Sequence, residues 1–135
     1  MKESKKAILK SLSKTAKKND RFDMLVLNMA LQKIDFENFD FDGDAVYTVD
    51  HKYLIYCLSQ KESISIPEGT EVIGEMAFRH KKALKSIVIP STVKTIGQDA
   101  FYDCDNLDNL YIPASVSTVR GYCFAECGSL KTFTF

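Results

Sequence analysis

Long apolar runs are missing from this sequence of 135 residues. A transmembrane helix needs about 18 or more consecutive apolar residues, so the sequence predicts no membrane span. The first residues, MKESKKAILKSLSK, carry lysines but lack the apolar stretch that forms the centre of a secretory signal. The sequence as it stands therefore predicts a cytoplasmic protein.

Catalytic and metal-binding motifs are missing as well. The only histidines are His51 and His80, and neither has a nucleophile at a recognised motif spacing. There is no glycine-rich phosphate loop, no H-E-x-x-H and no G-x-S-x-G. The four cysteines form no C-x-x-C pair of the kind that holds zinc. We therefore expect a protein that is not an enzyme and that carries no metal or cofactor.

What the sequence does contain is an internal repeat, which is the strongest guide to its fold. Three segments of 23 residues align without a gap, and a fourth begins at Thr132. All three prolines of the chain fall at one position of the repeat. The three segments are SISIPEGTEVIGEMAFRHKKALK (63–85), SIVIPSTVKTIGQDAFYDCDNLD (86–108) and NLYIPASVSTVRGYCFAECGSLK (109–131). No single repeat can bury its own apolar face, so we expect stacked coils.

The residue type at each position of the repeat has a physical explanation. The alternating Ile-x-Ile-Pro stretch predicts a short strand with two inward side chains, which proline ends because it has no N–H. A core between the two walls of each coil is predicted from three further features of the repeat. These are the apolar residue at the position of Ile73, the Ala-Phe pair and the final leucine. Gly74 and Gly97 suit a tight turn with positive φ, whereas Arg120 at the third position predicts an altered turn. The inward positions are Ile64, Ile66, Ile73, Phe78 and Leu84, then Ile87, Ile89, Ile96, Phe101 and Leu107, then Leu110, Ile112, Val119, Phe124 and Leu130, with Phe133 and Phe135 at the end.

This pattern resembles the BspA-like, or Treponema-type, leucine-rich repeat family, whose motif is L-x-x-I-x-I-P-x-x-V-x-x-I-G-x-x-A-F-x-x-C. The second repeat matches it at nearly every position, and the stretch from Gly43 to Tyr56 is similar to the segment that often precedes the repeats in the family. The resemblance covers about residues 43–135 and implies a solenoid. It does not imply any enzymatic activity. It also implies an adhesion or interaction protein, often at the cell surface or secreted, in contrast to the cytoplasmic prediction above.

The whole chain therefore predicts an α+β repeat protein of one structural domain. Residues 1–42 are expected to form a helical N-terminal cap, residues 43–62 a β-hairpin turning near Asp50 to Lys52, and residues 63–135 the leucine-rich-repeat solenoid. Apolar periodicity predicts helices from Ser4 to about Lys18 and from about Arg21 to Ile34, the second buried on more than one face.

The basic N-terminus leaves an alternative open. Residues 1–21 carry eight Lys and Arg against Glu3 and Asp20, so the first helix could bind a membrane surface or nucleic acid instead of only capping the solenoid. It lacks the Trp or Phe of membrane-surface helices and the mixture of Arg and aromatic residues that favours base stacking. The capping role is therefore favoured over both alternatives, and nucleic acid is not an expected partner.

The acidic stretch DFENFDFDGDA offers a second alternative, a calcium loop. Asp40, Asp42 and Asp44 alternate, but Gly43 and His51 occupy the wrong positions for an EF-hand. We expect a loop whose carboxylates are solvated and whose apolar side chains, Phe36, Phe39 and Phe41, pack on the core. Cys104 and Cys127 share one repeat position, so buried free thiols are expected there, with a disulfide as the alternative.

A non-catalytic protein–protein interaction module is the function that this pattern favours. The outward strand positions form a polar, uncharged face in which Tyr111 and Val88 are the expected centre of contact with an unknown protein partner. The expected binding residues are Ser86, Val88, Asn109, Tyr111, Thr132 and Thr134. The alternative is a structural fragment of a longer repeat protein that self-associates through its open C-terminal coil, at Leu130, Phe133 and Phe135.

Overall fold

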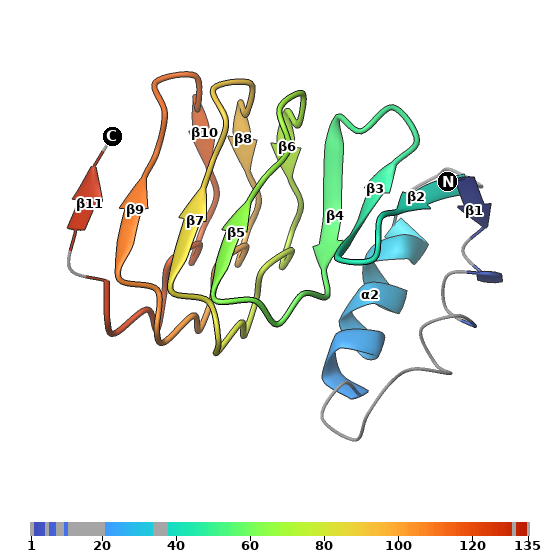
Figure 1. Cartoon of the computed structure of the whole chain (residues 1–135), viewed down its shortest axis with the longest axis horizontal. Helices are drawn as coiled ribbons and strands as arrows, with labels where there is room; N and C mark the ends of the chain where they lie inside the picture. The colour runs from blue at the N-terminus through green and yellow to red at the C-terminus, as the bar shows by residue number, and fades with distance from the viewer. Residues whose placement is uncertain are drawn as a thin grey trace.

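Two β-sheets face each other along the repeats and form the walls of a solenoid (Figure 1). The computed structural model describes residues 2–4, 6–7, 10, 21–33, 38–130 and 132–134. The long sheet has the strand order β1 (Lys2–Ser4), β2 (Asn38–Phe41), β3 (Ala45–Thr48), β4 (Tyr53–Cys57), β6 (Val72–Ile73), β8 (Thr95–Ile96) and β10 (Thr118–Val119). The short sheet has the order β11 (Thr132–Thr134), β9 (Asn109–Tyr111), β7 (Ser86–Val88) and β5 (Ser63–Ser65).

Each complete coil gives one strand to each sheet, and neighbouring coils pair in parallel. In the short sheet Ser63 pairs with Ser86, which in turn pairs with Asn109, so the partners are 23 residues apart along the chain. The long sheet has the same spacing, since Val72 pairs with Thr95 and Thr95 with Thr118. Equivalent side chains therefore lie in rows along the solenoid.

The glycines after the second strand of each coil serve close packing. Neither Gly74 nor Gly97 has positive φ, so the expected reason for them is wrong. A Cβ on Gly97 would lie only 2.7 Å from the backbone nitrogen of Glu75, and one on Gly74 only 2.8 Å from the carbonyl oxygen of Leu54. Glycine is needed because the backbone of each coil passes directly against the preceding one.

The left-handed backbone lies two residues further along, at non-glycine positions. Met76, Asp99 and Tyr122 have φ of 60°, 57° and 58°, once in each repeat. The third turn, with Arg120 in place of glycine, is altered in part, as expected. The N–H of Arg120 donates to the carbonyl of Ile96 at 3.0 Å, as the N–H of Gly97 does to that of Ile73 at 2.8 Å. Ala77 and Ala100 donate to the carbonyls of Gly74 and Gly97 at 3.1 and 3.2 Å, whereas the structure, which describes this turn, has no such bond from Cys123 to Arg120.

A row of stacked phenylalanines runs through the solenoid core. The rings of Phe78 and Phe101 are 5.1 Å apart and nearly parallel, and Phe124 follows at 5.4 Å from Phe101. Phe78 and Phe101 are fully buried, whereas Phe124 is half-buried and Val119 is 42% exposed, in contrast to the expected inward position. The core is therefore tightest in the first two repeats and more open in the third.

The hairpin of β3 and β4 continues the long sheet at the N-terminal end. The strands are antiparallel, and β4 pairs in parallel with β6 through Tyr53 and Val72. Tyr56 pairs with Val46 while Leu54 pairs with Tyr47, so Ile55 is an extra residue in β4. Because of this bulge, Ile55 and Tyr56 both enter the apolar cluster beneath the helix.

The helix α2 (Arg21–Lys33) packs on the face of the hairpin that points away from the solenoid core (Figure 1). Leu27 and Leu31 are buried against the sheet, one turn apart on the same face. Leu25 is 59% and Met29 42% exposed, so the expectation of burial on more than one face is wrong. Among the described residues, no helix is long and apolar enough to cross a membrane.

The N-terminal segment differs from the expected helix–loop arrangement. Ser4 belongs to β1, and its Oγ accepts a hydrogen bond from the N–H of Ala7 at 3.1 Å, as at a helix start. Lys6, Ala7 and Lys10 are helical, while most of the expected first helix, and Ile34 of the second, lie outside the described residues.

The acidic stretch contains a strand where we expected a loop. Strand β2 (Asn38–Phe41) pairs with both β1 and β3, because its alternating side chains suit a sheet. Phe39 is buried and Phe41 half-buried against the core, as expected, and Phe36 lies outside the described residues. The antiparallel end of the long sheet is thus four strands wide.

Candidate binding surface

The outward face of the short sheet carries two exposed apolar side chains in a polar surround. Val88 on β7 is 60% exposed and Tyr111 on β9 is 57% exposed. These residues are one repeat apart on neighbouring strands, and the inward residues between them, Ile87 and Leu110, are buried. Strand alternation therefore presents Val88 and Tyr111 to solvent side by side.

The rest of this face is uncharged. Ser63, Ser65 and Asn109 are exposed and Ser86 is half-buried. The Oγ atoms of Ser63 and Ser86 lie 2.9 Å apart, so they are hydrogen bonded across β5 and β7. A face of hydroxyl and amide groups with an apolar centre can contact a partner without first removing water from charges.

The other predicted contact residues lie at the C-terminal edge. Thr132 pairs with Asn109 and Thr134 with Tyr111 through the backbone of β11, and their side chains lie outside the described residues. Phe133 pairs with Leu110, Leu130 packs half-buried against the core, and Phe135 is outside the described part. The assignment of these residues to binding or self-association stays a prediction.

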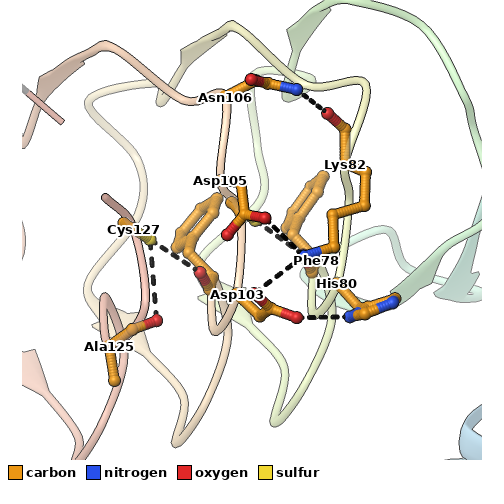
Figure 2. Close-up of polar contacts among 10 residues, drawn as sticks. Phe78, His80, Lys82, Asp103, Asp105, Asn106, Ala125 and Cys127 are labelled. Atoms are coloured by element: carbon orange, nitrogen blue, oxygen red, sulfur yellow. Dashed lines mark hydrogen bonds and ion pairs between the residues drawn. The ribbon is translucent and has the colours of Figure 1, made fainter. Parts of the chain in front are cut away.

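A second polar cluster, which the sequence analysis missed, lies on the turns of the first two repeats (Figure 2). Asp103 accepts hydrogen bonds from His80 Nδ1 at 2.6 Å and from Lys82 Nζ at 2.9 Å. Lys82 also contacts Asp105 Oδ2 at 2.6 Å, and Asn106 Nδ2 donates to the carbonyl of Lys82 at 2.6 Å. The cluster joins the basic turn Arg79–Lys82 to the acidic turn of the next coil.

These contacts shift the ionisation of the cluster. The hydrogen bond from Lys82 holds the pKa of Asp103 below its usual value, with a smaller contribution from His80. The hydrogen bonds to Asp105 and Asp103 raise the pKa of Lys82. The repeat spacing could have revealed the cluster, since His80 and Asp103, like Lys82 and Asp105, are 23 residues apart.

The cysteines hold neighbouring coils together by weak hydrogen bonds. Cys104 Sγ donates to the carbonyl of Phe78 at 3.1 Å, and Cys127 Sγ to that of Phe101 at 3.1 Å. All four cysteines are free and three are buried, while Cys127 is only half-buried, which corrects its expected burial. Burial raises the pKa of the Cys104 and Cys123 thiols to about 12 and also raises that of Cys127. These thiols have structural surroundings, not those of reactive nucleophiles.

The carboxylates of the acidic stretch make hydrogen bonds and ion pairs, so the expectation that they are simply solvated is wrong. Asp42 Oδ1 accepts the backbone N–H groups of Asp44 and Ala45, both at 2.8 Å, which fixes the turn into β3. Asp40 contacts His51 across the sheet, and the His51 ring stacks on Tyr47 at 4.9 Å. Within the described ranges, no three His, Cys, Asp or Glu side chains gather as they would around a metal ion.

Comparison with known proteins identifies the repeat. The profile of the BspA type leucine rich repeat region (6 copies) matches residues 48–135. No curated protein matches the chain.

Several solved bacterial leucine-rich-repeat structures are similar to the chain. A leucine-rich repeat protein from Eubacterium ventriosum has 28% identity and a TM-score of 0.68, over 72% of this chain and 27% of its own. The pneumococcal vaccine antigen PcpA has 28% identity and a TM-score of 0.56, over 70% of this chain and 30% of its own. A leucine rich cell surface protein from Faecalibacterium prausnitzii has 30% identity and a TM-score of 0.51, over 53% and 19%.

The chain thus spans less than a third of the length of each of these three structures. The profile match covers well over half of the chain, and the paired coils show the corresponding solenoid. The chain belongs to the BspA-type leucine-rich-repeat family.

Proposed function

We propose that this protein is a non-catalytic protein-interaction module that binds a protein partner through the outward face of the short sheet. The observation that supports this is the adjacent exposure of Val88 and Tyr111, at 60% and 57%, on neighbouring strands. Exposed tyrosine is enriched among the residues that dominate interface affinity. The residues around Tyr111 are small and uncharged, so a partner can bind there without removing water from a charged group. The expected contact set is Ser86, Val88, Asn109, Tyr111, Thr132 and Thr134.

The size of this face limits the affinity. The strands carry three described residues each, so the outward face is much smaller than the roughly 800 Å² that each partner buries in a standard interface. Neighbouring turns must therefore contribute, or the binding is weak and repeated along a longer array.

Site-specific photo-crosslinking tests this proposal. A benzoylphenylalanine at position 111 should crosslink one partner, whereas the same group at Tyr122, which is 73% exposed on a turn, should not. The dissociation constant of the recovered partner should rise about ten-fold or more for Tyr111→Ala and for Val88→Ser. Tyr122→Ala is the control. A partner whose affinity changes with neither Tyr111 nor Val88 would refute the proposed face.

The N-terminal elements are proposed to cap the solenoid. The hairpin β3–β4 has buried residues on both faces, and Leu27 and Leu31 of α2 cover the side away from the repeats. Shielding the first coil in this way is the role that terminal units have in repeat proteins. Leu27→Ser should therefore lower the unfolding midpoint of the repeats together with that of α2, as followed by circular dichroism and tyrosine fluorescence.

Self-association is a second candidate, favoured by the open third repeat. Val119 is 42% exposed, and Leu130 and Phe124 are only partly covered. Sedimentation velocity over a wide concentration range should show a dimer or larger species, which deletion of residues 132–135 should abolish. A monomer at every concentration would reject the contribution of Leu130, Phe133 and Phe135.

A further inference from the structure

The two sheets begin at different coils. The long sheet continues from β6 into β4 and β3, whereas the short sheet begins at β5. Among the described strands, none lies beside β5 and opposite β4, and Figure 1 shows β4 on the side of the first coil where the short sheet has already ended. In the described part of the chain, β5 pairs only with β7.

The unpaired edge of β5 presents hydrogen-bonding groups in a regular order. Ile66 donates its N–H to Val88, and Glu62 accepts from Ser86, so the even-numbered residues face β7. In a parallel ladder the alternate residues face the other way. The backbone N–H and C=O groups of Ser63 and Ser65 therefore point outward from the sheet edge, where they can pair with another strand.

A cavity of about 150 Å³ lies beside this edge. A cavity of that volume holds a molecule about as large as benzene, and hence one leucine-sized or phenylalanine-sized side chain. Its floor comes from the hairpin and the first coil, and one wall is the edge of β5. The apolar lining residues include Ala45, Tyr47, Leu54, Ile64 and Phe78.

The cavity mouth has an excess of negative charge. Asp42 and Asp44 line it together with one cation, Lys61, whose Nζ lies 3.2 Å from Asp44 Oδ2. The charge of Asp42 is thus not balanced by this ion pair. Its proximity also contributes, after burial, to raising the pKa of Tyr47. A positively charged group would be favoured next to an apolar one here.

We propose that an extended segment of a partner protein binds as an added strand along the outer edge of β5, with an apolar side chain in this cavity and a basic side chain at Asp42. This site goes beyond the proposed function, because it uses the sheet edge and not the outward face. The added strand would complete the short sheet opposite β4. Backbone pairing supplies affinity in this mode, and the cavity supplies selectivity.

A second copy of this chain fits the site less well than a foreign segment. If β11 of another copy paired with β5, its solenoid would bring β10 alongside β4 of the first copy. Both edges of β4 are already occupied, one by β3 and the other by β6. A single strand without an attached long sheet meets no such obstacle.

The probe is the hexapeptide Lys-Ser-Ile-Val-Ile-Pro, the sequence of residues 85–90, which contains a strand that pairs with the other edge of β5. Titrated into the ¹⁵N-labelled full chain, it should shift the amide signals of Ser63 and Ser65 saturably. A peptide with Glu in place of Lys should bind about three-fold more weakly, as expected for one exposed ion pair. Asp42→Asn should remove that difference while keeping the Oδ1 that fixes the turn, whereas the control Asp108→Asn should not.

Backbone methylation separates strand pairing from simple apolar contact. Methylation of the backbone nitrogens of Ser and Val in the peptide, or alternatively of its two Ile residues, should weaken binding about ten-fold for one set only, since alternate N–H groups face β5. Equal effects of the two sets, or no saturable shift at Ser63 and Ser65, would overturn the proposal. So would self-association that protects these amides, because the occupant would then be a second copy. Tyr111→Ala should leave the peptide affinity unchanged, which keeps this result separate from the proposed face.

Discussion

His80 Nδ1 lies 2.6 Å from Asp103 Oδ2, although these residues are separated by one whole repeat along the chain. Both have a left-handed backbone, with φ of 64° and 61°, so the turns that carry them have the same shape. Lys82 adds a second contact to Asp103 at 2.9 Å. A basic turn and an acidic turn in consecutive repeats are thereby joined through one carboxylate.

Removing the charge of Asp103 should destabilise the fold at neutral pH. Asp103→Asn keeps a residue type that tolerates positive φ, so the change isolates the charge. We expect the free energy of unfolding at pH 7 to fall by about 0.5–1 kcal/mol, in the range of partly exposed ion pairs. Urea unfolding would measure it.

The pH dependence of that loss follows from the lowered pKa of Asp103. The pKa of this carboxyl is lower in the folded protein than in the unfolded chain, where it is about 4. Its ionised form therefore stabilises the fold at any pH above about 4, and this contribution is lost as the pH falls through the pKa of the folded protein. The difference between Asp103→Asn and the unmodified chain should thus shrink in acid. A difference that persisted undiminished to pH 2 would contradict the ionic origin, and Asp105→Asn, at a more exposed carboxylate, should show a smaller effect.

Gly97→Ala should destabilise the solenoid through steric overlap. The added Cβ would lie 2.7 Å from the backbone nitrogen of Glu75, which cannot move without shifting the preceding coil. We expect a loss of about 1–3 kcal/mol in unfolding free energy, as for overpacked sites. Gly121→Ala is the matched control, because a Cβ there meets nothing within 4 Å. Similar melting temperatures for the two variants would argue against the close approach of the coils.

The stacked phenylalanines should differ in importance along the row. Phe101 is fully buried between Phe78 and Phe124, so Phe101→Ala should cost about 3–5 kcal/mol. Phe124 is only half-buried, so the same substitution there should cost distinctly less. Equilibrium denaturation of both variants under one set of conditions tests the order. Equal losses would mean that the third repeat is as well packed as the second.

Thiol labelling should distinguish the cysteines by burial. Cys127 is half-buried, whereas Cys104 and Cys123 are buried with a pKa raised to about 12, so few of their thiols are ionised at pH 8. Iodoacetamide at that pH should modify Cys127 first, and the other two only when urea unfolds the chain. Mass spectrometry of tryptic peptides would locate the label. Early modification of Cys104 in the folded protein would contradict its burial.

The alternation and spacing of the repeats predicted the parallel coils and their core because each position has a single dominant role. Ile66, Ile89 and Ile112 are all buried where alternation places them. The same spacing would also have predicted the His80–Asp103 and Lys82–Asp105 contacts, which were missed because charges were not compared from one repeat to the next. The outward exposure of Val88 and Tyr111 also follows from alternation, whereas their role in binding remains a prediction.

Other features depend on tertiary contacts that a repeat pattern does not contain. The need for glycine at Gly97 comes from the backbone of the neighbouring coil, not from its own φ. The strand at Asn38–Phe41 forms because β3 offers a partner edge, which overrides the loop-like composition of the acidic stretch. The side-chain pattern of β4 does not indicate the bulge at Ile55, because the bulge is defined by the register of β4 against β3.

The hairpin also restricts the positions at which further repeats can be added to the solenoid. Because β3 and β6 occupy both edges of β4, a duplicated repeat cannot be placed before that strand without displacing the hairpin. Between β6 and β8, by contrast, an inserted copy of 23 residues would meet the same partners on both sides that each present coil already has. Lengthening by gene duplication is therefore compatible with the fold only downstream of the hairpin, so homologues of different length should keep their first coil and vary in the number that follow.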